Sequence, residues 1–175
     1  FQSLEKPSRI ATTYTKTAEV LIVQAEYEQA YQFLSEALLI HRNEQFLYGI
    51  AEVNGKLGKL FIARQQYREA ISYLLLSIEA GQKRNDQVGA AEAFHDIARC
   101  HYQLGETNQA ERYLLQSEAL AEKYSLKKVQ RDVYFTAKEM AIKREQFKKA
   151  TDYYEKYLVI RDSLFNEEKS NMIAS

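Results

Sequence analysis

Four alanines recur at intervals of 40 residues, and this spacing constrains the fold more than any other feature of the sequence. They are Ala30, Ala70, Ala110 and Ala150, and each ends a short, mostly polar stretch such as QAEYEQA or RQQYREA. An aromatic residue follows three positions later in every case, and the four are Phe33, Tyr73, Tyr113 and Tyr153. A sequence period between about 20 and 50 residues is typical of repeated units stacked in an array. We therefore predict a stacked array rather than a single compact fold.

Each 40-residue unit contains two helical patterns. In the second unit, apolar residues recur every three to four positions over 53–61 and again over 71–78. The chain has one proline and six glycines in 175 residues, which favours helices. Each unit is therefore predicted to be a helical hairpin, in which the repeated alanine lets the two helices cross at about 8 Å. The eight predicted helices cover residues 8–25, 28–42, 46–64, 68–83, 87–104, 107–123, 127–145 and 148–172.

The third unit, AAEAFHDIARCHYQLGETNQAERYLLQSEAL, resembles a tetratricopeptide repeat. That family has a small residue, an aromatic residue, a glycine and an alanine in fixed order, and the residues in those places are Ala98, His101, Gly105 and Ala110. The resemblance implies an all-α, right-handed α-α superhelix of four hairpins in one domain spanning 1–175. The hairpins would cover about 8–45, 46–86, 87–126 and 127–162. The period is 40 rather than 34, which implies longer helices, and Lys138 stands where a small residue is expected.

Residues 163–175 continue beyond the last repeat. The stretch YLVIRDSLFNEEKSNMIAS resembles the end of the repeat region in bacterial sensor proteins, where a coiled coil leads to a histidine kinase or a DNA-binding output domain. Leu158, Phe165 and Met172 are seven residues apart, as the seam of a coiled coil requires. This interpretation predicts a possible homodimer through the C-terminal helix. The alternative is a helix that only caps the last hairpin, and the two are compatible.

The resemblance also implies a binding surface. In such a stack the first helix of each hairpin lines the concave side, and steps of three and four residues keep the inward positions on one helical face. Across the units these positions form one mostly acidic row, one row of changing sign and one apolar row, which suits an amphipathic helix or an extended peptide. The alternative is a solvated face whose charges neutralise one another. The candidate groove residues are Glu52, Lys59, Ile62, Glu92, His95, Arg99, Tyr102, Phe135, Glu139 and Ile142.

Charge and motif content argue against several other functions. Twenty-four basic and twenty-four acidic residues give no net field to attract nucleic acid, and no apolar run reaches the 18 to 20 residues of a membrane span. His95 and His101 are six residues apart on one helix and therefore cannot share a metal ion. Cys100 is the only cysteine and lies at a position predicted to be buried. We predict no catalytic residue, no metal, no cofactor, no nucleic-acid binding and no membrane insertion by this segment.

The sequence thus predicts a non-enzymatic module that binds a protein or peptide. The family resemblance implies the sensory or scaffolding domain of a bacterial signalling regulator, either periplasmic or cytoplasmic. Two alternatives stay open at this point. One is a cytosolic peptide-sensing inhibitor of response regulators, of the quorum-sensing type, and the other is a structural adaptor that assembles with itself.

Overall fold

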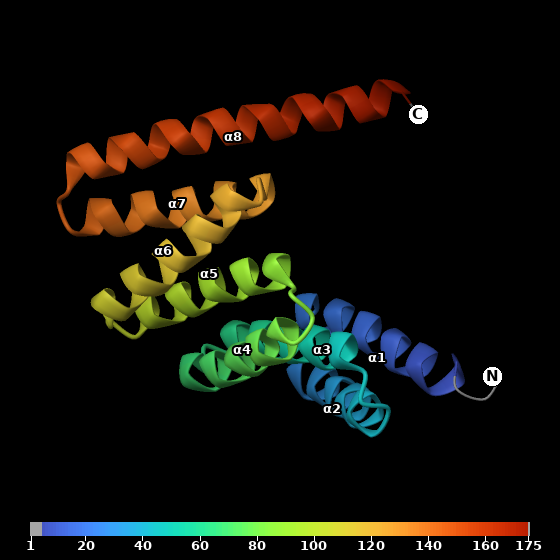
Figure 1. Ribbon diagram of the computed structural model, residues 1–175. Coiled ribbons are helices and arrows are strands. Elements are labelled where there is room, and N and C mark those ends of the chain that lie inside the picture. Colours follow the sequence, from blue (N-terminus) through green and yellow to red (C-terminus); the bar gives the residue numbers. More distant parts are fainter. Residues whose placement is uncertain (1–4, 175) are drawn as a thin grey trace.

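The computed structural model describes residues 5–174, which form eight α-helices without a strand in that range (Figure 1). The fold class is therefore the all-α repeat array that the sequence predicts. Consecutive helices pack in pairs, and four hairpins result. The helices are α1 (Glu5–Val23), α2 (Tyr27–Asn43), α3 (Leu47–Ala63), α4 (Tyr67–Gln82), α5 (Gln87–Gln103), α6 (Thr107–Lys123), α7 (Lys127–Lys143) and α8 (Phe147–Ala174).

The turns between helices repeat every 20 residues. Each contains one residue with positive φ, and the following N–H bonds to the carbonyl five residues back, as Glu106 does to His101 at 2.9 Å. This is the Schellman pattern of helix C-termini. The carbonyl of Glu106 then accepts the N–H of Ala110 and begins the next helix, so each turn is very short. The positive-φ residues are Ala25, Gln45, Gln65, Asn85, Gly105, Ser125 and Glu145.

These turns account for the errors in the predicted helix ends. The predicted first helix, 8–25, lies at Glu5–Val23, and the predicted seventh, 127–145, ends at Lys143. Gly105 and Asn85 are residues that favour positive φ, whereas Ala25, Gln45, Gln65, Ser125 and Glu145 have side chains that give no such signal. The sequence signal for the helix ends was therefore weak.

The hairpins stack through their first helices. α1 contacts α3, α3 contacts α5 and α5 contacts α7, while each second helix packs on the first helix of the next hairpin. The crossing alanines Ala30, Ala70 and Ala110 are 0% exposed, as expected for a close approach of two helices. Gly58 has the same role in the second hairpin, because a Cβ there would lie 2.6 Å from the Leu74 side chain. The result is an inner layer of first helices, along which the candidate groove residues lie.

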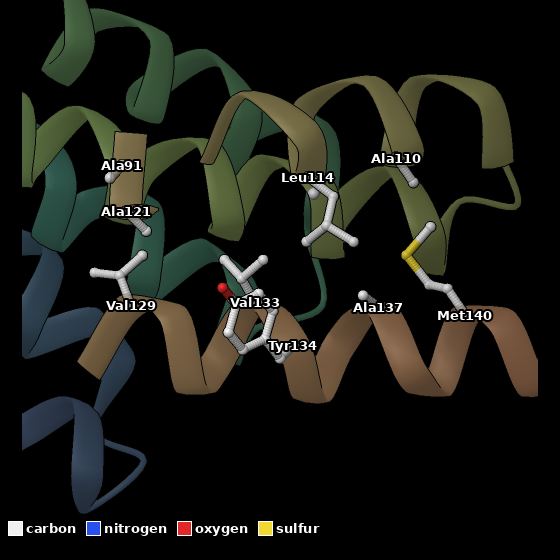
Figure 2. Close-up of a cluster of buried hydrophobic side chains, with 10 residues drawn as sticks. Ala91, Ala110, Leu114, Ala121, Val129, Val133, Tyr134, Ala137 and Met140 are labelled. Atoms are coloured by element: carbon white, nitrogen blue, oxygen red, sulfur yellow. The ribbon is translucent and has the colours of Figure 1, made fainter. Parts of the chain in front are cut away.

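The apolar core continues across the hairpin boundaries. Figure 2 shows the cluster in which Val133 and Met140 of α7 lie against the layer formed by α5 and α6, beside Ala110 and Leu114. Similar clusters join the first and second hairpins and the second and third. Since no hairpin has an enclosed core of its own, the stability of each depends on its neighbours.

The fourth hairpin departs from the repeat where α7 faces α8. Lys138 occupies the position of Ala18, Gly58 and Ala98, and its Nζ lies 4.3 Å from the centre of the Phe135 ring and 5.5 Å from that of Tyr154. Tyr154 in turn occupies the position of three buried leucines and is 45% exposed. A cation held against two aromatic rings replaces the small-residue contact of the other hairpins.

α8 is the longest helix of the structure and extends past the beginning of α7 (Figure 1). Lys127, the first residue of α7, donates a hydrogen bond to Ser163 Oγ at 3.0 Å and forms an ion pair with Glu167. The stretch predicted to extend or link beyond residue 163 is thus continuous with the last hairpin helix through Ala174.

Candidate ligand-binding groove

Two neighbouring hollows lie along the inner layer of helices. The first hollow, of about 340 Å³, lies between α3, α4 and α5 and includes Glu52, Lys59, Glu92 and Asp96. The second hollow, of about 780 Å³, lies between α3, α5 and α7. Both hollows include Lys59 and Asp96, so they form one continuous surface. The residues of the second hollow are Lys59, Ile62, Ala63, His95, Asp96, Arg99, Tyr102, Gln103, Arg131, Asp132, Phe135, Thr136, Glu139 and Tyr157.

Nine of the ten candidate groove residues line these hollows. Glu52 and Glu92 belong to the first, Lys59 to both, and Ile62, His95, Arg99, Tyr102, Phe135 and Glu139 to the second. The tenth, Ile142, is 47% exposed and lies outside both. The structure therefore brings nine of the ten predicted residues together on one surface.

Seven residues of the second hollow lie outside the predicted set, and they are Ala63, Asp96, Gln103, Arg131, Asp132, Thr136 and Tyr157. Arg131 and Thr136 lie on α7 beside the inward positions used for the prediction, and Tyr157 lies on the second helix of the last hairpin. The prediction considered only the first helix of each hairpin, so it could not include Tyr157. Its spacing of four residues from Tyr153, which packs against the core, was the available signal.

His95 connects α5 to α7. Its Nε2 lies 2.8 Å from Thr136 Oγ1, within hydrogen-bond distance. Burial lowers the pKa of His95 to about 4, and the positive charge of Arg99 adds to this effect. The ring is therefore neutral at pH 7. His95, a predicted groove residue, is thus a neutral side chain that bonds to the next hairpin and also lines the second hollow.

Asp96 lies between the two hollows, with 8% of its surface exposed. Its Oδ1 is 3.5 Å from Nη1 of Arg99, which is a long contact for an ion pair. Burial raises the pKa of Asp96, and the charges of Lys59 and Arg99 oppose this increase. A carboxylate in this setting favours a ligand that brings a positive charge or a hydrogen-bond donor.

The remaining charged groups of the second hollow are largely paired. Arg131 Nε lies 2.7 Å from Asp132 Oδ1, and Lys138 Nζ lies 2.8 Å from Glu139 Oε1. Aromatic side chains form the wall of this hollow, where the ring centres of Phe135 and Tyr157 are 5.6 Å apart. Such a surface offers apolar contact with charged groups at its margin, as peptide-binding grooves do.

Residues 5–174 offer few side chains that could bind a metal ion or act as a nucleophile. Among residues 5–174, no group of three or more His, Cys, Asp and Glu side chains is placed to hold a metal ion. Cys100 is buried, and burial raises the pKa of its thiol to about 12, so the reactive thiolate is scarce at pH 7. His101, which replaces the usual aromatic residue, bonds through Nδ1 to Glu106 at 2.6 Å and stacks on Tyr113. None of the helices described is both long and apolar enough to cross a membrane.

Comparison with solved structures shows the same architecture in other proteins. The chain is similar to aspartyl phosphate phosphatase F from Bacillus subtilis, with 17% identity, a TM-score of 0.84 and coverage of 92% of this chain and 41% of that one. It is similar to a Rap protein complexed with competence and sporulation factor, with 19% identity, a TM-score of 0.79 and coverage of 90% and 43%. The chain thus spans about two fifths of the length of these two proteins.

A third structure covers a different range. The TPR domain of FLU from Arabidopsis has 23% identity and a TM-score of 0.64, and the match covers 67% of this chain and 98% of that domain. No curated protein matches the sequence. Residues 49–123, which include most of the second and third hairpins, match the sequence model of the tetratricopeptide repeat family. These residues are therefore tetratricopeptide repeats, and the chain as a whole has the helical-repeat solenoid fold of that family.

Proposed function

We propose that this protein is a non-enzymatic binding module that holds a peptide or a protein helix along the surface formed by the two hollows. The observation that carries the proposal is the continuity of this surface over three hairpins, with an aromatic wall in the second hollow and unpaired charges at Glu52, Glu92 and Lys59 within the described residues. Helical-repeat proteins use such extended concave surfaces for recognition.

The compared structures support this function at the level of the class. One of them is a Rap protein complexed with competence and sporulation factor, so a closely similar fold holds a partner in that case. Another bears the name of a phosphatase. Because this chain spans about two fifths of either protein, their activities are not transferred to it. A sensory or scaffolding part in a signalling regulator is the specific role that we propose, with a peptide-sensing response-regulator inhibitor as the alternative favoured by these two similarities.

Binding would act on the arrangement of the hairpins. A ligand that contacts α3, α5 and α7 at once favours one relative orientation of these helices over others. Since α8 packs on α7, a change in that orientation moves α8 as well. This gives the module a physical route from its groove to its C-terminal helix.

The test is selection of peptides from a randomised display library on the immobilised protein, followed by calorimetry. Selected peptides should bind with a Kd in the micromolar range, and Phe135→Ala should weaken binding by about tenfold, because an aromatic anchor contributes on the order of 1 to 2 kcal/mol. The matched control is Leu115→Ala, since Leu115 is exposed on α6 outside both hollows. Equal loss in both variants, or a library without enriched peptides, would contradict groove binding.

A further inference from the structure

Two pairs of opposite charge face the hollows at a fixed separation. The acidic pair is Glu52 on α3 and Glu92 on α5, which occupy the same position in successive repeats. The basic pair is Lys59 and Arg99, which also occupy equivalent positions on the same two helices. Seven residues separate the pairs on each helix, which corresponds to about 10 Å along the helix axis.

These charges are poorly satisfied within the protein. In the described part of the chain, Glu52, Glu92 and Lys59 have neither a hydrogen bond nor an ion pair through their side chains. Arg99 has only the 3.5 Å contact with Asp96, and half of its side chain is exposed. By contrast, Lys56, which neighbours them in the first hollow, is paired with Glu19. The four charges are thus available to a ligand.

The surroundings of the acidic pair limit what can bind there. Leu74, Val88 and Ala93 contribute apolar surface to the first hollow, whose volume is about 340 Å³. An apolar wall around carboxylates suits the methylene chain and charged end of a lysine or arginine side chain. The buried carboxylate of Asp96 adds negative charge at the boundary with the second hollow.

The surroundings of the basic pair differ. Ile62, Tyr102 and Phe135 contribute apolar and aromatic surface to the second hollow, and Arg99 presents a half-exposed guanidinium beside them. Guanidinium and ammonium groups on neighbouring helices can hold one carboxylate between them. The surface therefore changes from cation-accepting to anion-accepting over about two helical turns.

We infer that the groove selects a peptide segment that presents a positive and a negative side chain on one face, about 10 Å apart, with the positive one at the acidic pair and the negative one at the basic pair. This inference rests on the proposed peptide-binding function. An α-helical ligand meets the distance with residues seven apart, and a polyproline II segment meets it with residues three apart.

The experiment uses peptides selected on the wild-type protein and a variant in which both pairs are reversed: Glu52→Lys, Glu92→Lys, Lys59→Glu and Arg99→Glu. The reversed variant has the same net charge and the same number of positive and negative residues in the groove. It therefore tests only which end of the groove is acidic and which is basic. Peptides selected on the wild type should carry a basic and an acidic residue three or seven positions apart. They should bind the reversed variant at least tenfold more weakly, and exchanging the two charged residues of the peptide should restore binding to that variant.

Controls separate this inference from the proposed function. Replacing the basic residue of the peptide with methionine should weaken binding to the wild type but not to Glu52→Gln/Glu92→Gln, because the partner charges are then already absent. Selected peptides that bind both proteins equally, or that lack the charge spacing, would overturn the charge-order inference and leave groove binding intact. A library without enriched peptides would overturn both. Circular dichroism should show equal melting temperatures for all variants.

Discussion

At the scale of single residues, the turns between helices place side-chain-bearing residues in the left-handed backbone conformation, which is strained for them. Six of the seven positive-φ residues have a side chain, and Gly105 alone lacks one. The left-handed conformation costs a residue with a Cβ roughly 1 kcal/mol relative to glycine. Glycine at such a turn would relieve this strain, and its greater freedom in the unfolded chain offsets part of that gain.

Gln65→Gly should stabilise the protein by about 0.5 to 1 kcal/mol, because glycine adopts the φ of 59° at this turn without strain. The measurement is urea denaturation at pH 7. Two controls have the opposite sign: Gly105→Ala introduces the strain at the equivalent turn, and Ser72→Gly places glycine inside α4, where it costs about 0.5 to 1 kcal/mol. A destabilised Gln65→Gly would show that its side chain stabilises the turn in some other way.

The same scale includes a titrating group. Because the folded-state pKa of His95, about 4, lies below the unfolded value of 6.5, the unfolded chain binds a proton more readily as the pH falls. Stability from this residue is complete above pH 6.5 and is lost between about 6.5 and 4, by about 3 kcal/mol at most. His41, buried between hairpins with a lowered pKa, adds loss in the same direction.

His95→Gln should flatten this dependence. Glutamine retains a hydrogen-bonding group near Thr136 but does not titrate, so the variant should lose less stability than the wild type between pH 7 and pH 4. Asp96, whose pKa burial raises, contributes a slope of opposite sign in both proteins and cancels in the comparison to first order. Denaturation curves at intervals of half a pH unit provide the measurement. Parallel curves for the two proteins would mean that His95 is accessible to protons in the folded state.

At the scale of helices, the crossing alanines set how closely each hairpin closes. Ala110 of α6 is fully buried in the cluster of Figure 2, and nothing larger fits without displacing its neighbours. Ala110→Leu should therefore destabilise the protein by roughly 1 to 3 kcal/mol, measured by urea denaturation. Ala119→Leu is the matched control, since Ala119 is exposed on the same helix. Equal stability of the two variants would remove the packing role assigned to the repeated alanine.

α8 has exposed apolar residues through which two copies of the protein could pair. Phe165 lies on the predicted coiled-coil seam and is 64% exposed. We expect the protein to form a homodimer through this helix, and Phe165→Glu should convert it to a monomer, because two carboxylates would meet in an apolar seam. Multi-angle light scattering at concentrations of about 10 to 100 μM measures this. Val159→Glu, at another exposed apolar position of α8 that lies outside the seam, is the control. A wild-type monomer would contradict the expectation.

At the scale of the whole molecule, the repeat made the fold predictable. The 40-residue alanine spacing determined the number of hairpins, and the family resemblance indicated which face of the first helices lines the concave side. Nine of the ten candidate residues line the two hollows. What the sequence could not supply were contacts between hairpins. The bond from His95 to Thr136 joins residues 41 apart, and Tyr157 reaches the second hollow from a helix outside the inner layer. Such contacts depend on the angle between successive hairpins, which no local pattern encodes.

The length of α8 has a mechanical consequence. At 1.5 Å per residue its 28 residues extend about 42 Å, while α7, on which it packs, has 17 residues. Because α8 is bonded to the first residue of α7 through Ser163 and Glu167, the two helices tilt as one body. The seven described residues after Glu167 extend about 10 Å beyond this contact. A tilt of the fourth hairpin is therefore carried directly to the exposed end of α8.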